Sequence, residues 1–391
     1  MAAETAKQFD ALEAQAQLLM SVFAKAGHEA VAPAIIQPAD VFLDVIGENL
    51  RARTYVFTDP DGAELCLRPD LTVPTCRLHL SRYDDPTKAA RYCYNGPAFR
   101  FQPQGADEAH PREFRQAGIE RFGDDDKPQA EAETIALIIR AVEAAGLKKW
   151  SLQIGDLALF AAILNAAALP ERWQRRLDAA FWRPDAFKAE LARLTAPGAL
   201  TAQLPSVLQT ALASCDADAR TAAVQSYLDD NAFDVFGVRT VGEVTARLTD
   251  LAADATMPPL DTSIASLIAS YLAIKGPART AGQQIAALLK AHGKAAGAVL
   301  ECYDRRLALI ANTGIDLDRV MFSAEFGRNL EYYTGLVFEV LAPELGARSP
   351  VAGGGRYDKL MRSAGSVVDV AAVGAAIHTE RLLSVVKGGS A

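Results

Sequence analysis

The sequence lacks several features that assign a chain to common protein classes. Its five cysteines are odd in number and none shows Cys-x-x-Cys spacing, which argues against a disulfide framework or a zinc site and predicts reduced thiols. No apolar run approaches the roughly 20 residues that span a bilayer. The N-terminus has no charged segment followed by an apolar one, so no signal peptide is predicted. We expect a cytoplasmic protein with no membrane partner.

Runs of lysine or arginine are also absent. The formal net charge is −8, and no stretch of sequence predicts the basic surface typical of nucleic-acid binding. We therefore expect no nucleic-acid partner, and the sequence suggests neither a metal site nor a cofactor. With 391 residues, 50% of them hydrophobic, the chain is long enough for two domains or for one domain with a large insertion.

The most informative stretch runs from Gly96 to Gly123. Its two arms, residues 96–103 and 113–123, are short, rich in aromatic side chains and bounded by Gly or Pro, which predicts two antiparallel strands. The segment between them is too long for a tight hairpin turn.

Alternation along the second arm places Gln116, Gly118 and Glu120 on one face of the sheet. The glycine leaves room above that face, and Arg100 lies on the first arm. A guanidinium can bind a carboxylate or phosphate, and a glutamate can bind an amine or a ring N–H, so this surface can hold a small zwitterion. The alternative is a solvated sheet face with ordinary ion pairs.

The remaining segments alternate between strand and helix patterns up to residue 155 and again after residue 312. Before residue 155 we predict helices at 5–26, 39–46 and 127–145, and one that starts after Asp70 or Thr72 and runs to about residue 83. We predict strands at 31–38, 55–59, 64–67, 90–95 and 150–154. After residue 312 we predict strands at 320–323, 334–341, 348–352 and 369–377, and a final helix from residue 378.

Between these two parts, residues 156–311 are rich in alanine and leucine and show helical periodicity broken by prolines. We expect residues 1–155 and 312–391 to form one domain, with 156–311 as a mainly α-helical insertion. Two local features stay open. Asp70 is either part of a site or the cap of the helix that follows it. The glycines at 353–355 either form a tight turn or allow close approach of backbone or ligand.

Five motifs in this order resemble the class II aminoacyl-tRNA synthetase fold, and within it the histidyl-tRNA synthetase branch. The resemblance covers roughly residues 5–155 and 312–386 and implies an α+β fold, an antiparallel sheet flanked by helices, with an α-helical insertion. The motifs are Leu-Arg-Pro-Asp-Leu-Thr at 67–72, the strand-loop-strand at 96–123, Arg-Asn-Leu-Glu-Tyr-Tyr at 328–333, Gly-Gly-Arg-Tyr-Asp at 354–358 and the strand-to-helix segment 374–382.

The resemblance implies a histidine-binding pocket. Around the α-amino group of the amino acid it places Asp70, Thr72 and Gln116. Arg100 and Arg328 would lie near the carboxylate. Around the imidazole it places Glu120, Tyr332, Tyr333 and Tyr357, whose carboxylate and hydroxyl groups can accept from and donate to a ring.

The sequence also departs from the synthetase pattern. No anticodon-binding domain is expected after the last motif. In the 96–123 motif, Arg100 is followed by Phe-Gln-Pro-Gln, which is one residue shorter than the synthetase version and lacks its glutamate. His378 stands where the synthetases have a small glycine, and an imidazole there should fill space that the adenine of ATP needs. Arg381 is kept. We therefore expect no adenylate formation.

Together these features resemble the regulatory subunit family of ATP phosphoribosyltransferase. This implies a non-catalytic chain that dimerises within a hetero-octamer, activates the short-form catalytic subunit in the first step of L-histidine biosynthesis and contributes to allosteric feedback inhibition by histidine. Two alternatives remain: an amino-acid-activating enzyme that uses Arg100, Arg328 and Arg381, and a histidine sensor for another partner.

Overall fold

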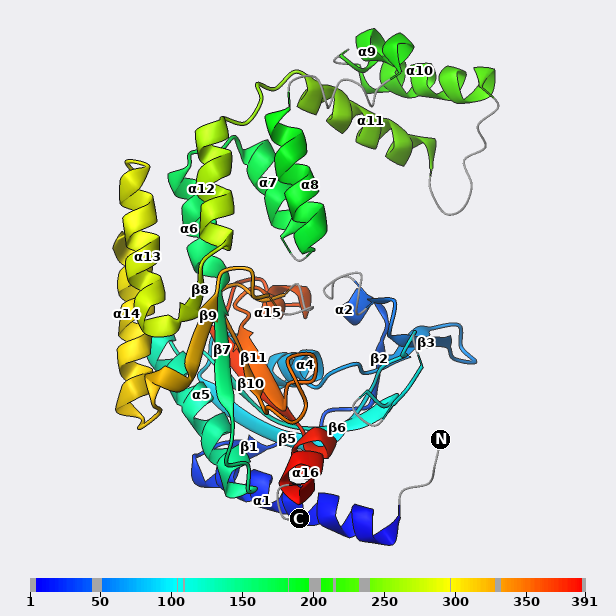
Figure 1. Ribbon diagram of the computed structural model, residues 1–391. Helices are drawn as coiled ribbons and strands as arrows, with labels where there is room; N and C mark the ends of the chain where they lie inside the picture. Colours follow the sequence, from blue (N-terminus) through cyan, green and yellow to red (C-terminus); the bar gives the residue numbers. More distant parts are fainter. Residues whose placement is uncertain are drawn as a thin grey trace. The chain divides into compact units, whose positions relative to one another are not determined.

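The chain divides into two compact units (Figure 1). A computed structural model describes residues 5–43, 51–103, 105–107, 110–181, 183–196, 205–213, 216–231, 240–295, 297–327 and 332–388. The larger unit combines Met1–Ala166 with Ser270–Ala391, and the smaller unit is Ala167–Ala269. The smaller unit therefore lies inside the expected insertion, 156–311, and the flanks of that region belong to the larger unit.

The described part of the larger unit contains a nine-stranded sheet and a three-stranded sheet. The nine strands, in spatial order, are β1 (Glu29–Ala30), β5 (Ala90–Phe99), β6 (Glu113–Phe122), β12 (Ala372–His378), β11 (Ala352–Arg356), β10 (Leu336–Leu341), β7 (Ser151–Asp156), β9 (Val320–Ser323) and β8 (Lys275–Pro277). The small sheet has the order β2 (Ile36–Pro38), β4 (Glu64–Leu67), β3 (Tyr55–Thr58).

The large sheet is mixed, so the expectation of a purely antiparallel sheet is wrong. β1 runs parallel to β5, and β7 runs parallel to β9. Both parallel pairs join strands that are distant in the sequence, and such pairings leave no signal in the local pattern. The strand β8, which extends the sheet beyond β9, lies in the region where no strand was predicted; it has only three residues, one of them proline.

The predicted strand-loop-strand motif is confirmed as β5 and β6. The two strands pair from Ala90 opposite Phe122 to Phe99 opposite Glu113. β5 is one continuous strand, which unites the segment predicted at 90–95 with the first arm of the motif. β6 also pairs with β12, from Phe122 opposite Ala372 to Gln116 opposite His378.

Helices cover both faces of the sheet, as two neighbouring residues of β6 demonstrate. Glu120 and Arg121 point to opposite faces because side chains alternate along a strand. Arg121 forms an ion pair with Glu133 of α5 (Lys127–Ala144), whereas Glu120 accepts a hydrogen bond from Thr72 of α4 (Thr72–Arg82). The helix α5 therefore covers one face and α4 the other.

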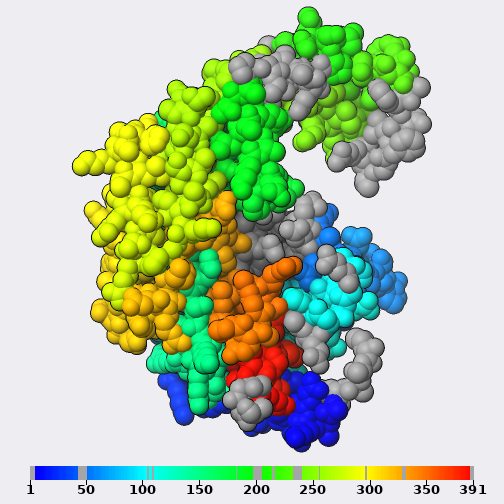
Figure 2. Space-filling model, in the orientation of Figure 1, coloured from blue at the N-terminus to red at the C-terminus, as the bar shows by residue number. Residues whose placement is uncertain are grey.

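Helices near both ends of the chain pack together. α1 (Ala6–Lys25) contacts α16 (Thr379–Gly388), and Figure 2 shows the two, blue and red, side by side on the surface. α1 also lies along α5, and it buries Leu19 and Phe23 completely. Other helical elements in the described part of this unit are α2 (Asp40–Leu43), α6 (Leu157–Ala166), α13 (Ala278–Ala291), α14 (Gly297–Asn312), the 3-10 turn η2 (Leu317–Arg319) and α15 (Leu360–Ser363).

The described part of the smaller unit is helical, as predicted. Thr240 and Glu243 form a capping box that starts α11, in which each side chain binds the backbone N–H of the other. Buried Trp173 anchors the start of the unit and donates to the carbonyl of Pro258 at 3.3 Å. The helices are α7 (Glu171–Ala180), α8 (Pro184–Thr195), α9 (Ser206–Leu212), α10 (Ala217–Asp230), α11 (Val241–Ala255) and the start of α12 (Thr262–Leu272).

Three local predictions need correction or fall outside the described residues. The strand predicted at 31–38 is two short strands, β1 and β2, with 31–35 between them. The strand predicted at 348–352 lies later, as β11, and contains the glycines 353–355. The end of the helix predicted at 39–46 lies outside the described residues. No helix in the described part of the chain is both long enough and apolar enough to cross a membrane.

Candidate functional site

Glu120 lies at the centre of the candidate site and is fully buried. Its carboxylate accepts hydrogen bonds from the hydroxyl groups of Thr72 at 2.7 Å and Tyr94 at 2.9 Å, and from the hydroxyl of Tyr357. Three hydroxyl donors from α4, β5 and the segment after β11 thus hold one carboxylate in a single position. The site is built on strands and a helix start, so its geometry is rigid.

Two glycines make room for this arrangement. Gly374 of β12 lies opposite Glu120, and a Cβ added at residue 374 would overlap the Glu120 carboxylate. Gly118 lies opposite Tyr94, and a Cβ there would lie 2.6 Å from the Tyr94 hydroxyl. The sequence pattern predicted open space above Gly118. That space is filled by Tyr94, which was not among the predicted residues.

Replacing Gly374 by alanine should therefore disturb the site directly. We expect Gly374→Ala to lower the free energy of unfolding by about 1–3 kcal/mol, because overpacking in a rigid core forces side chains or backbone to move. Urea denaturation measures the change. The control is Gly297→Ala at the start of α14, where an added Cβ meets nothing within 4 Å; its effect should stay below about 0.5 kcal/mol. Equal effects in the two variants would contradict this account of Gly374.

The ionisation of Glu120 couples the site to pH. Burial raises the pKa of Glu120 from 4.5 to about 7, although its hydrogen bonds from Tyr357, Thr72 and Tyr94 act in the opposite direction. Between these two values the folded chain keeps a proton that the unfolded chain releases. The contribution of Glu120 to stability is therefore present at low pH and is lost as the pH rises towards 7.

A comparison of the wild type with Glu120→Gln should reveal this titration. The stability of the wild type relative to the variant should fall by about 2–3 kcal/mol between pH 5 and pH 7.5, since one pKa unit corresponds to about 1.4 kcal/mol. Urea denaturation at several pH values measures both curves, and groups other than Glu120 cancel in the difference. Parallel curves would show that residue 120 does not titrate in this range.

Asp70 supports the start of the helix that follows it, which is one of the two interpretations that the sequence left open. One carboxylate oxygen accepts from the backbone N–H of Val73 at 3.3 Å, so it supports the start of α4. The other oxygen, Oδ2, is buried and has no hydrogen-bond partner among the described residues. Burial raises the pKa of Asp70, and the nearby Arg100 guanidinium opposes this.

Gln116 offers a second unused acceptor on the face of β6 that carries Glu120. Its Oε1 atom is buried and has no hydrogen-bond partner in the described part of the chain. The side-chain oxygen of Asn95, one residue before Gly96 on β5, is in the same situation. A buried oxygen that accepts no hydrogen bond lowers the stability of the folded chain. The ammonium group of an amino acid has three N–H donors that could satisfy such oxygens.

Three tyrosines gather beside Glu120. The ring centroids of Tyr332 and Tyr333 lie 4.9 Å apart, and Tyr357 lies 5.8 Å from Tyr332 and 6.4 Å from Tyr333. Tyr333 packs against Gly355, where a Cβ would lie 2.9 Å from the tyrosine ring. The glycines of β11 therefore allow close approach to neighbouring groups and do not form a tight turn.

Arg100, Phe114 and His378 form a stack next to the site. The guanidinium of Arg100 lies 5.0 Å from the Phe114 centroid and its Nε donates to the carbonyl of Pro69 at 2.9 Å. The imidazole of His378 lies 5.1 Å from the same Phe114 ring, at an interplanar angle of 35°, and is 8% exposed. His378 thus packs against Phe114. Arg381 donates to the carbonyl of Pro350 at 3.0 Å.

The structure brings together most of the predicted residues. Glu120 contacts Thr72 and Tyr357, and Tyr332 and Tyr333 complete that cluster. Arg100 lies by the segment that carries Asp70, and Gln116 lies on the same strand as Glu120. Arg328 lies outside the described residues. The sequence analysis did not predict Tyr94 or Asn95 as site residues. Tyr94 could have been found from its position opposite Gly118 on the neighbouring strand, because an aromatic side chain often packs over a glycine there.

The Gly-Gly-Arg-Tyr-Asp motif also links the large sheet to the helices α5 and α14. Arg356 forms ion pairs with buried Glu131 of α5 and with Asp358, at 2.8 Å from the latter. Glu131 also binds Arg306 of α14, which reaches Asp156 at 2.6 Å. Burial alone would lower the pKa of Arg306, but the carboxylates of Glu131 and Asp156 raise it, so the guanidinium stays charged.

Sequence comparisons relate this chain to known proteins. The family model described as histidyl-tRNA synthetase matches residues 4–234 and 220–382. Proteins named ATP phosphoribosyltransferase regulatory subunit are 35% identical in Rhizobium rhizogenes, over 93% of this chain and 95% of that protein, and 36% identical in Agrobacterium fabrum, over 94% and 95%. The protein of the same name from a Chelativorans strain is 34% identical over 90% and 92%.

Solved structures agree on the fold. A Bacillus halodurans protein described as an ATP phosphoribosyltransferase regulatory subunit/histidyl-tRNA synthetase superimposes with a TM-score of 0.67 at 20% identity, over 99% of this chain and 82% of that one. A histidine–tRNA ligase subunit from Alicyclobacillus acidocaldarius gives 0.60 at 21% identity, over 100% and 97%. The fold is that of histidyl-tRNA synthetase, and by its sequence the chain belongs to the family of ATP phosphoribosyltransferase regulatory subunits.

Proposed function

We propose that this chain assembles with the short-form catalytic subunit of ATP phosphoribosyltransferase and activates it in the first step of L-histidine biosynthesis. The observation that carries the proposal is identity of 34–36% with regulatory subunits of that enzyme over nearly the whole chain. The chain acts without catalysis of its own, in the cytoplasm, as a dimer within a hetero-octamer.

Histidine is the proposed ligand of the site around Glu120. Asp70 Oδ2 and Gln116 Oε1 are buried acceptors without donors among the described residues, which suits an α-ammonium group. The Glu120 carboxylate and the tyrosine cluster suit an imidazole. Through this site the chain would contribute to feedback inhibition, because a ligand that binds two states of the assembly unequally shifts their equilibrium.

The position of His378 supports a role other than amino-acid activation. Adenylate formation needs a nucleotide beside the amino acid, and the imidazole against Phe114 takes up space on that side of the site. We expect no amino-acid-dependent exchange of pyrophosphate into ATP, either with the wild type or after mixing with the partner. Measurable exchange that His378→Gly leaves unchanged would instead favour the activating enzyme.

Co-expression with the short-form catalytic subunit tests the main proposal. The two chains should elute together from a sizing column, and the rate of the catalytic subunit should rise when this chain is added. L-Histidine should then lower the rate of the complex. Separate elution together with an unchanged catalytic rate would make the proposal wrong. If the chains assemble but histidine has no effect on the rate, assembly stands and the feedback role does not.

A further inference from the structure

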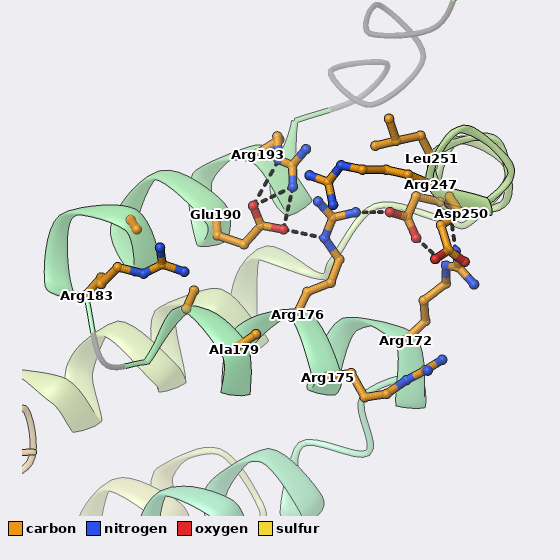
Figure 3. Close-up of a pocket in the computed structure, with 13 residues that line it drawn as sticks. Arg172, Arg175, Arg176, Ala179, Arg183, Glu190, Arg193, Arg247, Asp250 and Leu251 are labelled. Carbon is orange, nitrogen blue, oxygen red and sulfur yellow. Dashed lines mark hydrogen bonds and ion pairs between the residues drawn. The ribbon is translucent and has the colours of Figure 1, made fainter. Parts of the chain in front are cut away.

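The smaller unit contains a pocket of about 520 Å³ whose lining is unusually basic (Figure 3). Helices α7, α8 and α11 form its walls. Among the described residues, only three acidic ones line it, Glu190, Asp250 and Asp254. The chain as a whole carries a net charge of −8, so this local excess of positive charge runs against its overall composition. The lining arginines are Arg172, Arg175, Arg176, Arg183, Arg193 and Arg247.

Half of these arginines are neutralised within the unit. Arg172 pairs with Asp250 at 2.8 Å and with Asp254. Arg176 pairs with Asp254 and, at 2.5 Å, with Glu190, which also binds Arg193 at 2.5 Å. Three arginines and three carboxylates thus form a connected set that ties α7 to α8 and α11. This set needs no further ion for charge balance.

The other three arginines have no carboxylate of the lining left to neutralise them. Arg175 lies 3.8 Å from Glu171, one helical turn away and outside the pocket. Arg183 and Arg247 form no ion pair with the described residues. Figure 3 shows Arg247 reaching from α11 toward Arg176 and Arg193, with Arg183 at the opposite side of the view. Guanidinium groups that approach one another repel unless an anion lies between them.

We infer that this pocket binds a small polyphosphate, such as the diphosphate or triphosphate group of a nucleotide or sugar. Among the described lining residues, six arginines against three carboxylates leave an excess of three positive charges, or two when the exposed pair of Arg175 with Glu171 outside the lining is counted. A diphosphate or triphosphate group carries a comparable negative charge near neutral pH. Planar guanidinium groups bind phosphate oxygens in pairs. The positions of Arg183 and Arg247 at separate parts of the lining suit an elongated anion, and the volume is within the range of small-molecule sites.

Calorimetric titration of the full chain with inorganic tripolyphosphate tests the inference, with pyrophosphate and ATP as further arms that distinguish an inorganic ligand from a nucleotide. The wild type should show saturable binding that weakens with added salt. The double variant Arg183→Gln and Arg247→Gln should bind at least tenfold more weakly, because each loses a charge-assisted hydrogen bond. These residues make no ion pair with described residues, so circular dichroism should be unchanged.

The matched control is Lys188→Gln, which removes one positive charge from α8 at a residue that does not line the pocket. Its affinity should stay within about twofold of the wild type. An equal loss in the control and the double variant, or no saturable binding in any arm, would overturn the inference. Tight binding of an RNA oligonucleotide without binding of the polyphosphates would also overturn it. The same holds if no polyphosphate binds and the double variant loses assembly with the partner, because the pocket would then bind a macromolecule.

Discussion

Glu131→Gln should lower the free energy of unfolding of the larger unit by about 3–5 kcal/mol. Glu131 is 1% exposed and accepts from two buried guanidinium groups, those of Arg306 and Arg356. An amide removes the negative charge and turns an NH2 donor toward one of these two donors. Breaking a buried ion pair by changing one partner is costly, because the remaining charges stay buried without compensation.

The matched control lies two residues further along the same helix. Glu133 also binds a buried arginine, Arg121, but its side chain is 41% exposed and Arg121 keeps a second partner in Asp124. Glu133→Gln should therefore cost less than about 1 kcal/mol. Urea denaturation combined with hydrogen exchange in β7 and β10 reports on the larger unit specifically. Similar losses for both variants would show that the buried network contributes little.

Glu120→Gln should weaken L-histidine binding by about 10- to 100-fold. On the proposed function, the Glu120 carboxylate accepts the imidazole N–H, and a hydrogen bond to a charged group contributes about 1.5–3 kcal/mol. The glutamine keeps the shape of the side chain but loses the charge. Calorimetric titration at pH 8 measures the effect. At this pH the Glu120 carboxyl is ionised, because its pKa lies at about 7.

Glu113→Gln provides the control for this experiment. Glu113 begins the same strand, β6, but is exposed and lies away from the hydroxyl groups that surround Glu120. Its variant should bind histidine like the wild type. Tyr333→Ala, which removes one ring of the tyrosine cluster, should weaken binding as Glu120→Gln does. If both site variants bind normally, histidine binds elsewhere, for example at the interface with the catalytic partner.

Much of the candidate site follows from local sequence. Alternation along β6 correctly places Gln116 and Glu120 on one face, because that pattern depends only on the strand geometry. The turn at Asp59–Gly62, which joins β3 to β4, likewise consists of residue types that favour a turn.

Other features depend on residues distant in the sequence and could not be read from local pattern. Glu131 appears as one more charged residue on an amphipathic helix, and only the packing of α5 against α14 and β11 reveals its two arginine partners. The glycines of β11 resemble a turn because their role, close contact with β12 and Tyr333, is set by neighbouring strands. The parallel pairings of β1 with β5 and of β7 with β9 also join strands that are distant in the sequence, so the local pattern does not reveal them.

The parallel pairing of β7 and β9 has a consequence for how this family can vary. Parallel neighbours cannot be joined by a hairpin, so the chain must return along the length of the first strand before the second strand begins. The connection from β7 to β9 contains the helices α6, α13 and α14, all of which lie in the larger unit. The segment 167–269 therefore extends a connection that the sheet requires in any case. Insertions and deletions in that segment can accumulate without shifting the register of either strand.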